Sequence, residues 1–156
     1  MKFEKLALIG CGLMGGSFAL ALKKAGLVAH VAGFSASSGS RQKALSMGVI
    51  DSIAESAAQA VQGADLVLVA VPVRATHATF VSIAPTLSPN ALLMDVGSTK
   101  ADVVAAARAT LGERLPCFVP AHPIAGKEVA GIEHADALLY QDRQLILTPL
   151  PSNGLR

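Results

Sequence analysis

The chain has 156 residues, of which 52% are hydrophobic and 15% are charged, so it can bury a full core and is expected to form one globular domain. Its thirteen Lys and Arg residues are scattered, its net charge is +2 and only 4% of its residues are aromatic, which argues against a nucleic-acid-binding protein. Cys11 and Cys117 have neither a CxxC spacing nor a histidine cluster beside them, so we predict no metal site and no disulfide, and we expect a cytoplasmic protein.

The N-terminus superficially imitates a secretion signal that ends at Cys11. We exclude that interpretation because the apolar core before Cys11 is only five residues long, whereas a signal peptide needs about 7–15, and because Glu4 lies where a signal should be basic. The stretch 6–22 is interrupted by glycines and is shorter than the roughly 20 residues that cross a bilayer, so we expect no membrane partner.

Strands and helices are predicted to alternate along the chain. The continuous apolar run 6–9 is typical of a strand buried on both faces of a parallel sheet. Met14, Phe18 and Leu22 recur every fourth residue and predict a helix over 14–25, with Gly26 at its C-cap. The elements predicted after it are strand 28–34, a polar loop 35–40, helices 41–47 and 52–61, strand 66–71, helix 75–83, strand 91–96, helix 99–111, and strands 117–121 and 144–148.

This alternation predicts a doubly wound α/β fold, with a mainly parallel Rossmann sheet and helices on both faces. We expect residues 1–150 to form the domain and residues 151–156 to begin a linker.

A glycine-rich loop follows the first predicted strand. Gly10, Gly12 and Gly15 match the pattern G-x-G-x-x-G, in which backbone N–H groups and a helix N-terminus bind the pyrophosphate of a dinucleotide. The alternative is a tight strand-to-helix turn without a ligand. We expect cofactor contacts from these glycines and from residues at the same carboxyl edge of the sheet, namely Leu13, Met14, Val71, Pro72 and Gly97.

Ser35 occupies the position at the end of the second strand where NAD-binding proteins usually carry an acidic residue. A site without a carboxylate there cannot repel a 2′-phosphate, and Ser37 and Arg41 lie close by, so NADP is favoured over NAD. The alternative for Arg41 is a solvated helix residue.

Ser98 and His122 also follow predicted strands and are expected at the same edge. Ser98 or Thr99 is expected to cap the next helix whatever else it does, and a lone histidine is often structural. A histidine at the mouth of a nicotinamide site can accept a proton from a substrate hydroxyl as hydride leaves, which is the role we favour for His122.

The segments GCGLMGGS (10–17), AVPV (70–73), DVGSTK (95–100), HPIAGKE (122–128) and LILTP (145–149) together resemble the nucleotide-binding half of prephenate/arogenate dehydrogenases. The resemblance implies oxidative decarboxylation of prephenate or arogenate in tyrosine biosynthesis, with hydride passing to NAD(P)⁺. It implies that His122 polarises the ring hydroxyl, that Ser98 orients His122 and the hydroxyl, and that Glu128 lies at the pocket entrance.

Members of this family normally continue into a helical domain that dimerises and supplies an arginine for the substrate carboxylate. Such a domain would begin where this chain stops, at Arg156, so we expect the cofactor-binding part of the enzyme, and a homodimer only with the helical domain. Two alternatives are an NADP-dependent dehydrogenase of the 3-hydroxyacid type, which should carry a catalytic lysine on a later helix, and a non-catalytic nucleotide-binding module.

Overall fold

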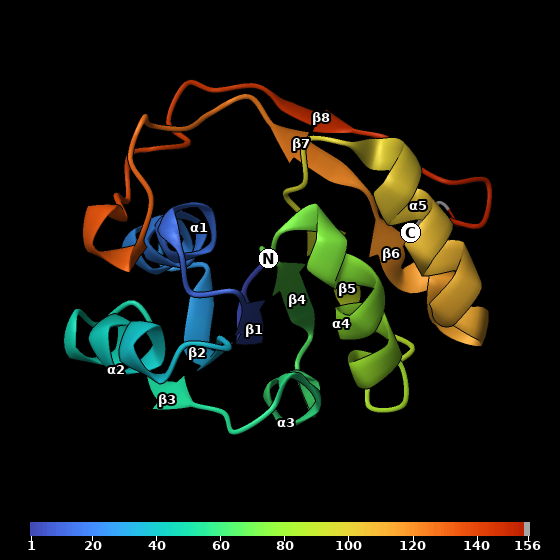
Figure 1. Cartoon of the computed structure of the whole chain (residues 1–156), viewed down its shortest axis with the longest axis horizontal. Helices are drawn as coiled ribbons and strands as arrows, with labels where there is room; N and C mark the ends of the chain where they lie inside the picture. The colour runs from blue at the N-terminus through green and yellow to red at the C-terminus, as the bar shows by residue number, and fades with distance from the viewer. Residues whose placement is uncertain (155–156) are drawn as a thin grey trace.

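A parallel sheet of six strands, in the order β3-β2-β1-β4-β5-β6, runs through the middle of the computed structural model, which describes residues 1–154 (Figure 1). Its strands are β1 (Phe3–Ile9), β2 (Val28–Phe34), β3 (Ser52–Ile53), β4 (Leu66–Val69), β5 (Leu92–Asp95) and β6 (Phe118–Val119). The helices are α1 (Leu13–Lys24), α2 (Ser38–Ser46), α3 (Ala57–Val61), α4 (Thr76–Ile83) and α5 (Lys100–Thr110), with 3₁₀ turns η1 (Val73–Ala75), η2 (Gly112–Cys117) and η3 (Ile132–His134). The doubly wound Rossmann fold predicted from the sequence is confirmed.

Both faces of the sheet are covered, which explains why its central strands are apolar without alternation. Leu6 and Leu8 of β1 pack on the side of α1 and α2, while Ala7 and Ile9 belong to the core cluster that includes residues of α3, α4 and α5. Figure 1 shows α1 and α2 on one side of the sheet and α4 and α5 on the other. All four residues of β4 are buried between these layers.

The strand order reverses beside β1, which pairs in parallel with both β2 and β4. In open α/β sheets a crevice forms at this reversal, outside the carboxyl ends of the strands. The glycine loop after β1 and the residues after β4 therefore meet at the rim of such a crevice.

Several predicted bounds were wrong. The helix expected over 41–47 begins earlier, at Ser38, because the Ser37 hydroxyl caps it, so the polar loop expected over 35–40 is shorter. The helix expected over 52–61 begins only at Ala57, because Ser52 and Ile53 instead pair with Ala32 and Gly33 at the edge of the sheet. The strand expected over 117–121 divides at Pro120: Phe118 and Val119 pair with β5, and the chain then leaves the main sheet.

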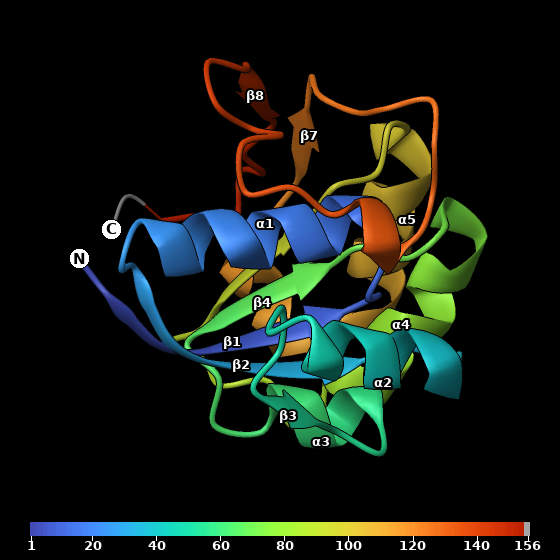
Figure 2. The ribbon, with the colours of Figure 1, turned by 90° about the vertical axis from the view of Figure 1, so that its left-hand side faces the viewer.

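After Pro120, β7 (Ala121–Pro123) pairs antiparallel with β8 (Leu145–Leu147) in a separate two-stranded sheet. Figure 2 shows this pair standing above α1 and away from the main sheet. The following tail packs back on the domain: Leu150 is buried, and the Asn153 side-chain amide donates hydrogen bonds to the carbonyls of Pro116 (3.0 Å) and Phe118 (2.8 Å). Of the predicted linker 151–156, residues 155–156 lie outside the described residues.

Within residues 1–154 no helix is long and apolar enough to cross a membrane.

Candidate functional site

The glycine loop is shaped by close backbone contacts. Gly10 has φ +101°, and a Cβ on it would lie 2.2 Å from the carbonyl oxygen of Ala70 at the end of β4. A Cβ on Gly15 would lie 2.4 Å from the carbonyl oxygen of Gly10, so α1 and β1 approach closely only because both positions are glycine.

Gly12 faces open space, since a Cβ built on it would meet nothing within 4 Å. It is the N-cap of α1 and makes no side-chain cap hydrogen bond, and the first turn of the helix carries no acidic residue. The first amides of a helix have no partner inside it and attract anions. The loop therefore fits the diphosphate of a dinucleotide.

Two neighbouring hollows extend from this loop along the carboxyl edge of the sheet. We call the first the β2-side hollow; it is lined by Ile9, Gly10, Cys11, Gly12, Phe34, Ser35, Ala36, Ser40, Ala70, Val71, Pro72, Ala75, Thr79 and Gly131. We call the second the β5-side hollow; it is lined by Gly12, Leu13, Met14, Ala70, Val71, Pro72, Val73, Val96, Gly97, Ser98, Gly126, Lys127, Val129, Ala130 and Gly131. Their volumes, about 380 Å³ and about 530 Å³, lie within the range of roughly 300–1,000 Å³ typical of small-molecule sites.

The two hollows together form one cleft at the glycine loop, and most of the predicted cofactor residues line it. Gly12, Val71 and Pro72 belong to both hollows and so connect them. The other predicted cofactor residues that line a hollow are Gly10 and Ser35 on the β2 side, and Leu13, Met14 and Gly97 on the β5 side.

Ser37 and Arg41 lie beside the β2-side hollow rather than in its lining. The Ser37 hydroxyl caps α2 by accepting a hydrogen bond from the Ser40 amide at 3.2 Å. The Arg41 guanidinium lies 5.6 Å from the centre of the Phe34 ring, and its Nη1 is 3.5 Å from the carbonyl oxygen of Ala54. Arg41 is thus held against a residue that lines the hollow, not free in solvent.

Cys11 lines the β2-side hollow and is only 3% exposed. Burial raises the pKa of the Cys11 thiol to about 11, and the charge of Arg41 opposes this rise. The thiol is therefore protonated and unreactive at neutral pH.

A buried ion pair, not foreseen from the sequence, fixes the chain just before His122. The Asp95 carboxylate, 2% exposed, pairs with the Lys100 ammonium and accepts hydrogen bonds from the amides of Gly97 (2.9 Å) and Ala121 (3.0 Å). Lys100 also donates to the Ala121 carbonyl at 2.6 Å. Both polar backbone groups of Ala121 are thereby held; the signal for this was an aspartate at the end of an apolar strand with a lysine five residues later.

The predicted catalytic residues lie at different depths. Ser98 is exposed in the β5-side hollow, whereas His122 is half-buried in β7 opposite Ile146 and lines neither hollow. Among residues 1–154 no hydrogen bond joins Ser98 to His122, and Glu128 is exposed without a side-chain partner. The predicted capping of α5 is not found, because its N-cap, Thr99, makes no side-chain cap hydrogen bond.

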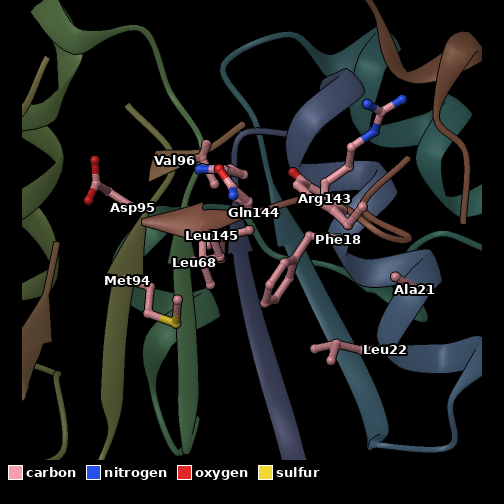
Figure 3. Close-up of a pocket in the computed structure, with 12 residues that line it drawn as sticks. Phe18, Ala21, Leu22, Leu68, Met94, Asp95, Val96, Arg143, Gln144 and Leu145 are labelled. Carbon is pink, nitrogen blue, oxygen red and sulfur yellow. The ribbon is translucent and has the colours of Figure 1, made fainter. Parts of the chain in front are cut away.

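A smaller cavity of about 260 Å³ lies apart from the glycine loop, between α1, the sheet and β8 (Figure 3). Its walls are mostly apolar, and Figure 3 shows the Phe18 ring pointing towards Leu68, Met94 and Leu145. The side chains of Asp95 and Arg143 point away from this ring. The cavity therefore presents a mainly apolar surface, unlike the helix N-terminus that opens at the glycine loop.

The chain is similar to proteins of a known family. The family model described as "Prephenate dehydrogenase, nucleotide-binding domain" matches residues 18–155. Cyclohexadienyl dehydrogenase of Zymomonas mobilis is 38% identical over 149 residues, which are 94% of this chain and 50% of that protein. Prephenate dehydrogenase of Bacillus subtilis is 37% identical over 147 residues, 94% of this chain and 39% of that protein.

A crystal structure of prephenate dehydrogenase from Aquifex aeolicus, in complex with hydroxyphenyl propionate and NAD⁺, superposes on this chain with a TM-score of 0.88 at 32% identity. The match covers 99% of this chain and 53% of that one. The chain thus spans about half the length of these three relatives, or less.

Proposed function

We propose that this chain, which belongs to the prephenate dehydrogenase family through its nucleotide-binding domain, is the cofactor-binding half of an enzyme that oxidatively decarboxylates prephenate or arogenate. The observation that carries the proposal is the glycine loop, where the N-terminus of α1 opens into the cleft without a side-chain cap. A bound nicotinamide would supply the hydride acceptor.

The chain's own residues bind the cofactor and handle the substrate hydroxyl. Amides around Gly12 hold the diphosphate, and the β5-side hollow receives the nicotinamide end. His122 hydrogen-bonds the ring hydroxyl and accepts its proton as hydride leaves. Ser98 orients His122 and the hydroxyl, and Glu128 lies at the entrance of the substrate pocket. Loss of carbon dioxide makes the ring aromatic, which drives the reaction, so the protein contributes mainly orientation.

NADP is the cofactor that we favour over NAD. Ser35 lines the β2-side hollow, and among the described residues that line it there is no carboxylate to repel a 2′-phosphate. The hydroxyl of Ser37 and the guanidinium of Arg41 lie beside the same hollow.

A helical domain beyond this chain would supply the arginine for the substrate carboxylate and the surface for a homodimer. This part of the proposal rests on the family and on the length of the relatives, of which the chain covers about half or less. Both cysteines are free thiols, and we expect the enzyme to work in the reducing cytoplasm.

The first experiment is a titration of this chain with NADP⁺ and NAD⁺, followed by prephenate in the same cell while reduced nicotinamide is monitored. We expect NADP⁺ to bind, with turnover only when the helical domain is present. Failure to bind either cofactor would contradict the proposal. Binding without oxidation, even with the helical domain, would favour a non-catalytic nucleotide-binding module.

The role of His122 is tested with His122→Asn in a chain that includes the helical domain. Removing a general base typically costs about 10²–10⁴-fold in rate, so kcat should fall at least 100-fold while the Kd for NADP⁺ changes little. Equal losses in turnover and affinity would make the histidine structural. Ser98→Ala should give a smaller loss of the same kind.

A further inference from the structure

Residues 124–131, between β7 and η3, form one wall of the β5-side hollow through Gly126, Lys127, Val129, Ala130 and Gly131. We call this segment the strap. Its side chains are largely exposed, so it has little core packing of its own.

The strap is attached at both ends. At its start the Ile124 amide donates to the Gln144 carbonyl at 2.8 Å, next to β8. After its end, the buried Ile132 packs on α1 so closely that a Cβ on Gly16 would lie 2.5 Å from Ile132 Cδ1. The seven residues between these attachments need another contact if the wall is to keep its shape.

Lys127 provides that contact. Its ammonium lies 3.2 Å from Asp136 Oδ2 and donates to the His134 carbonyl at 3.4 Å. Among the described residues, no other side chain of the strap makes a hydrogen bond or an ion pair.

Asp136 is itself fixed to α1. Its amide donates to the hydroxyl of Ser17 at 2.9 Å, and Ser17 is fully buried on α1. Its Oδ1 accepts from the Leu138 amide at 2.9 Å. The Leu138 amide, and then Lys127, lower the pKa of the Asp136 carboxyl, which is therefore an anion at neutral pH. A continuous chain of contacts thus joins the wall of the hollow to the helix that forms its floor.

We propose that Lys127 and Asp136 act as a latch that holds the strap against α1 and so keeps the β5-side hollow shaped for the nicotinamide end of the cofactor. Both are positioning residues, and the inference rests on the cofactor binding proposed above. The pair is partly exposed, with side chains 37% and 40% accessible, so breaking it should weaken cofactor binding only about two- to fivefold.

A direct attraction between Lys127 and the anionic cofactor is the competing explanation. The two explanations predict opposite changes in cofactor affinity when Asp136 is substituted. Removing the negative charge with Asp136→Asn should strengthen binding if only charge matters. It should weaken binding if the latch matters, because the strap loses its attachment. Asparagine can still accept the Leu138 amide at Oδ1, so the local turn is preserved.

The test is the Kd for NADP⁺ of the unaltered chain, Lys127→Met, Asp136→Asn and the double variant. We expect each single variant to bind NADP⁺ about two- to fivefold more weakly. The double variant should bind no more weakly than the single variant with the larger loss, since both substitutions break the same contact. Lys23→Met is the matched control: it breaks a 2.7 Å ion pair with Asp51 near the far end of α1 and should leave the Kd unchanged. Tighter binding by Asp136→Asn, or additive losses in the double variant, would overturn the latch.

Hydrogen exchange of the strap amides separates this inference from the proposed function. In the absence of cofactor, Asp136→Asn should speed exchange at 126–130 relative to the unaltered chain and to Lys23→Met. If the unaltered chain binds no cofactor, the proposed function fails while exchange still reports on the latch. Unchanged exchange together with unchanged Kd would overturn the latch alone.

Discussion

Different kinds of contact fix the shapes of the two hollows of the cleft. On the β2 side the shape comes from backbone: Gly10 touches the Ala70 carbonyl and its amide donates to the Phe34 carbonyl at 2.8 Å. On the β5 side it comes from side chains that join distant segments, such as Asp95 to Ala121 and Lys127 to Asp136. Substitutions should therefore act through steric strain on one side and through lost polar contacts on the other.

The largest effect is expected from Asp95→Ala. It leaves the Lys100 ammonium and the Ala121 amide without their partner, and breaking a buried ion pair costs about 3–5 kcal/mol. Urea denaturation measures this loss. Asp65→Ala is the control, because Asp65 also accepts two backbone amides, from Glu4 and Lys5, but at a more exposed place; it should cost about 1 kcal/mol. Equal losses of unfolding free energy in the two variants would mean that the buried Asp95–Lys100 pair stabilises the fold no more than an exposed carboxylate does.

Gly10→Ala should come next, with a loss of at least about 2 kcal/mol, because the new methyl group meets the Ala70 carbonyl and the positive φ is unfavourable for alanine. Gly12→Ala is its counterpart: it should leave the unfolding midpoint nearly unchanged and yet weaken NADP⁺ binding, since its methyl group projects into the open face. If both variants lose the same free energy of unfolding, the close contact between Gly10 and the Ala70 carbonyl does not determine the shape of the β2-side hollow.

A change of cofactor preference is expected for Ser35→Asp. The added carboxylate should repel a 2′-phosphate and bond a ribose hydroxyl, shifting the ratio of Kd values towards NAD⁺ by about tenfold, or ~1.4 kcal/mol. Ser37→Asp places the same charge at a helix cap, where aspartate is equally favourable, and should shift the ratio less. An unchanged ratio in Ser35→Asp would show that the ribose lies elsewhere.

The smallest effect concerns the thiol of Cys11, studied in a Cys117→Ala background. With a thiol pKa raised to about 11, alkylation by iodoacetamide should be slow at pH 8 and should accelerate as the pH rises towards that value. The raised pKa also makes the stability of the fold depend on pH. The protonated thiol stabilises the fold fully below the unfolded pKa of 9.0, and this contribution is lost as the pH rises through about 11. Fast alkylation at pH 8 would mean that the β2-side hollow is open to solvent at Cys11.

The β2 side could be predicted from the sequence because its determinants are local. The apolar run of β1, the glycines and the periodic helix are consecutive, and strand 28–34 was confirmed at both ends. The β5 side depends on contacts that no local pattern encodes. The Ala121 amide, for example, bonds the Asp95 carboxylate just after the chain leaves the main sheet. One contact on the β2 side is equally non-local: Ser52 joins the edge strand β3 beside β2, where the Asp51 carboxylate accepts the Val31 amide at 2.8 Å. The local sequence 52–61 is rich in small helix-forming residues and gave no sign of this pairing.

The same distinction applies to individual site residues. Gly10, Gly12 and Ser35 were identified by position alone, and they line the cleft. The partners of Arg41 and Lys127 could not be predicted, because the Phe34 ring and the Asp136 carboxylate reach them only through the folded arrangement. The assignments of His122, Ser98 and Glu128 stay predictions until turnover is measured.

Gly15 and Gly16 are adjacent but face opposite directions: the first lies against β1, and the second lies under Ile132. A side chain at position 16 would push against Ile132 Cδ1 and Ala135 Cβ, in η3 and just after it. The second glycine, directly after the fingerprint, therefore leaves room for a later segment of the chain to cross over the first helix.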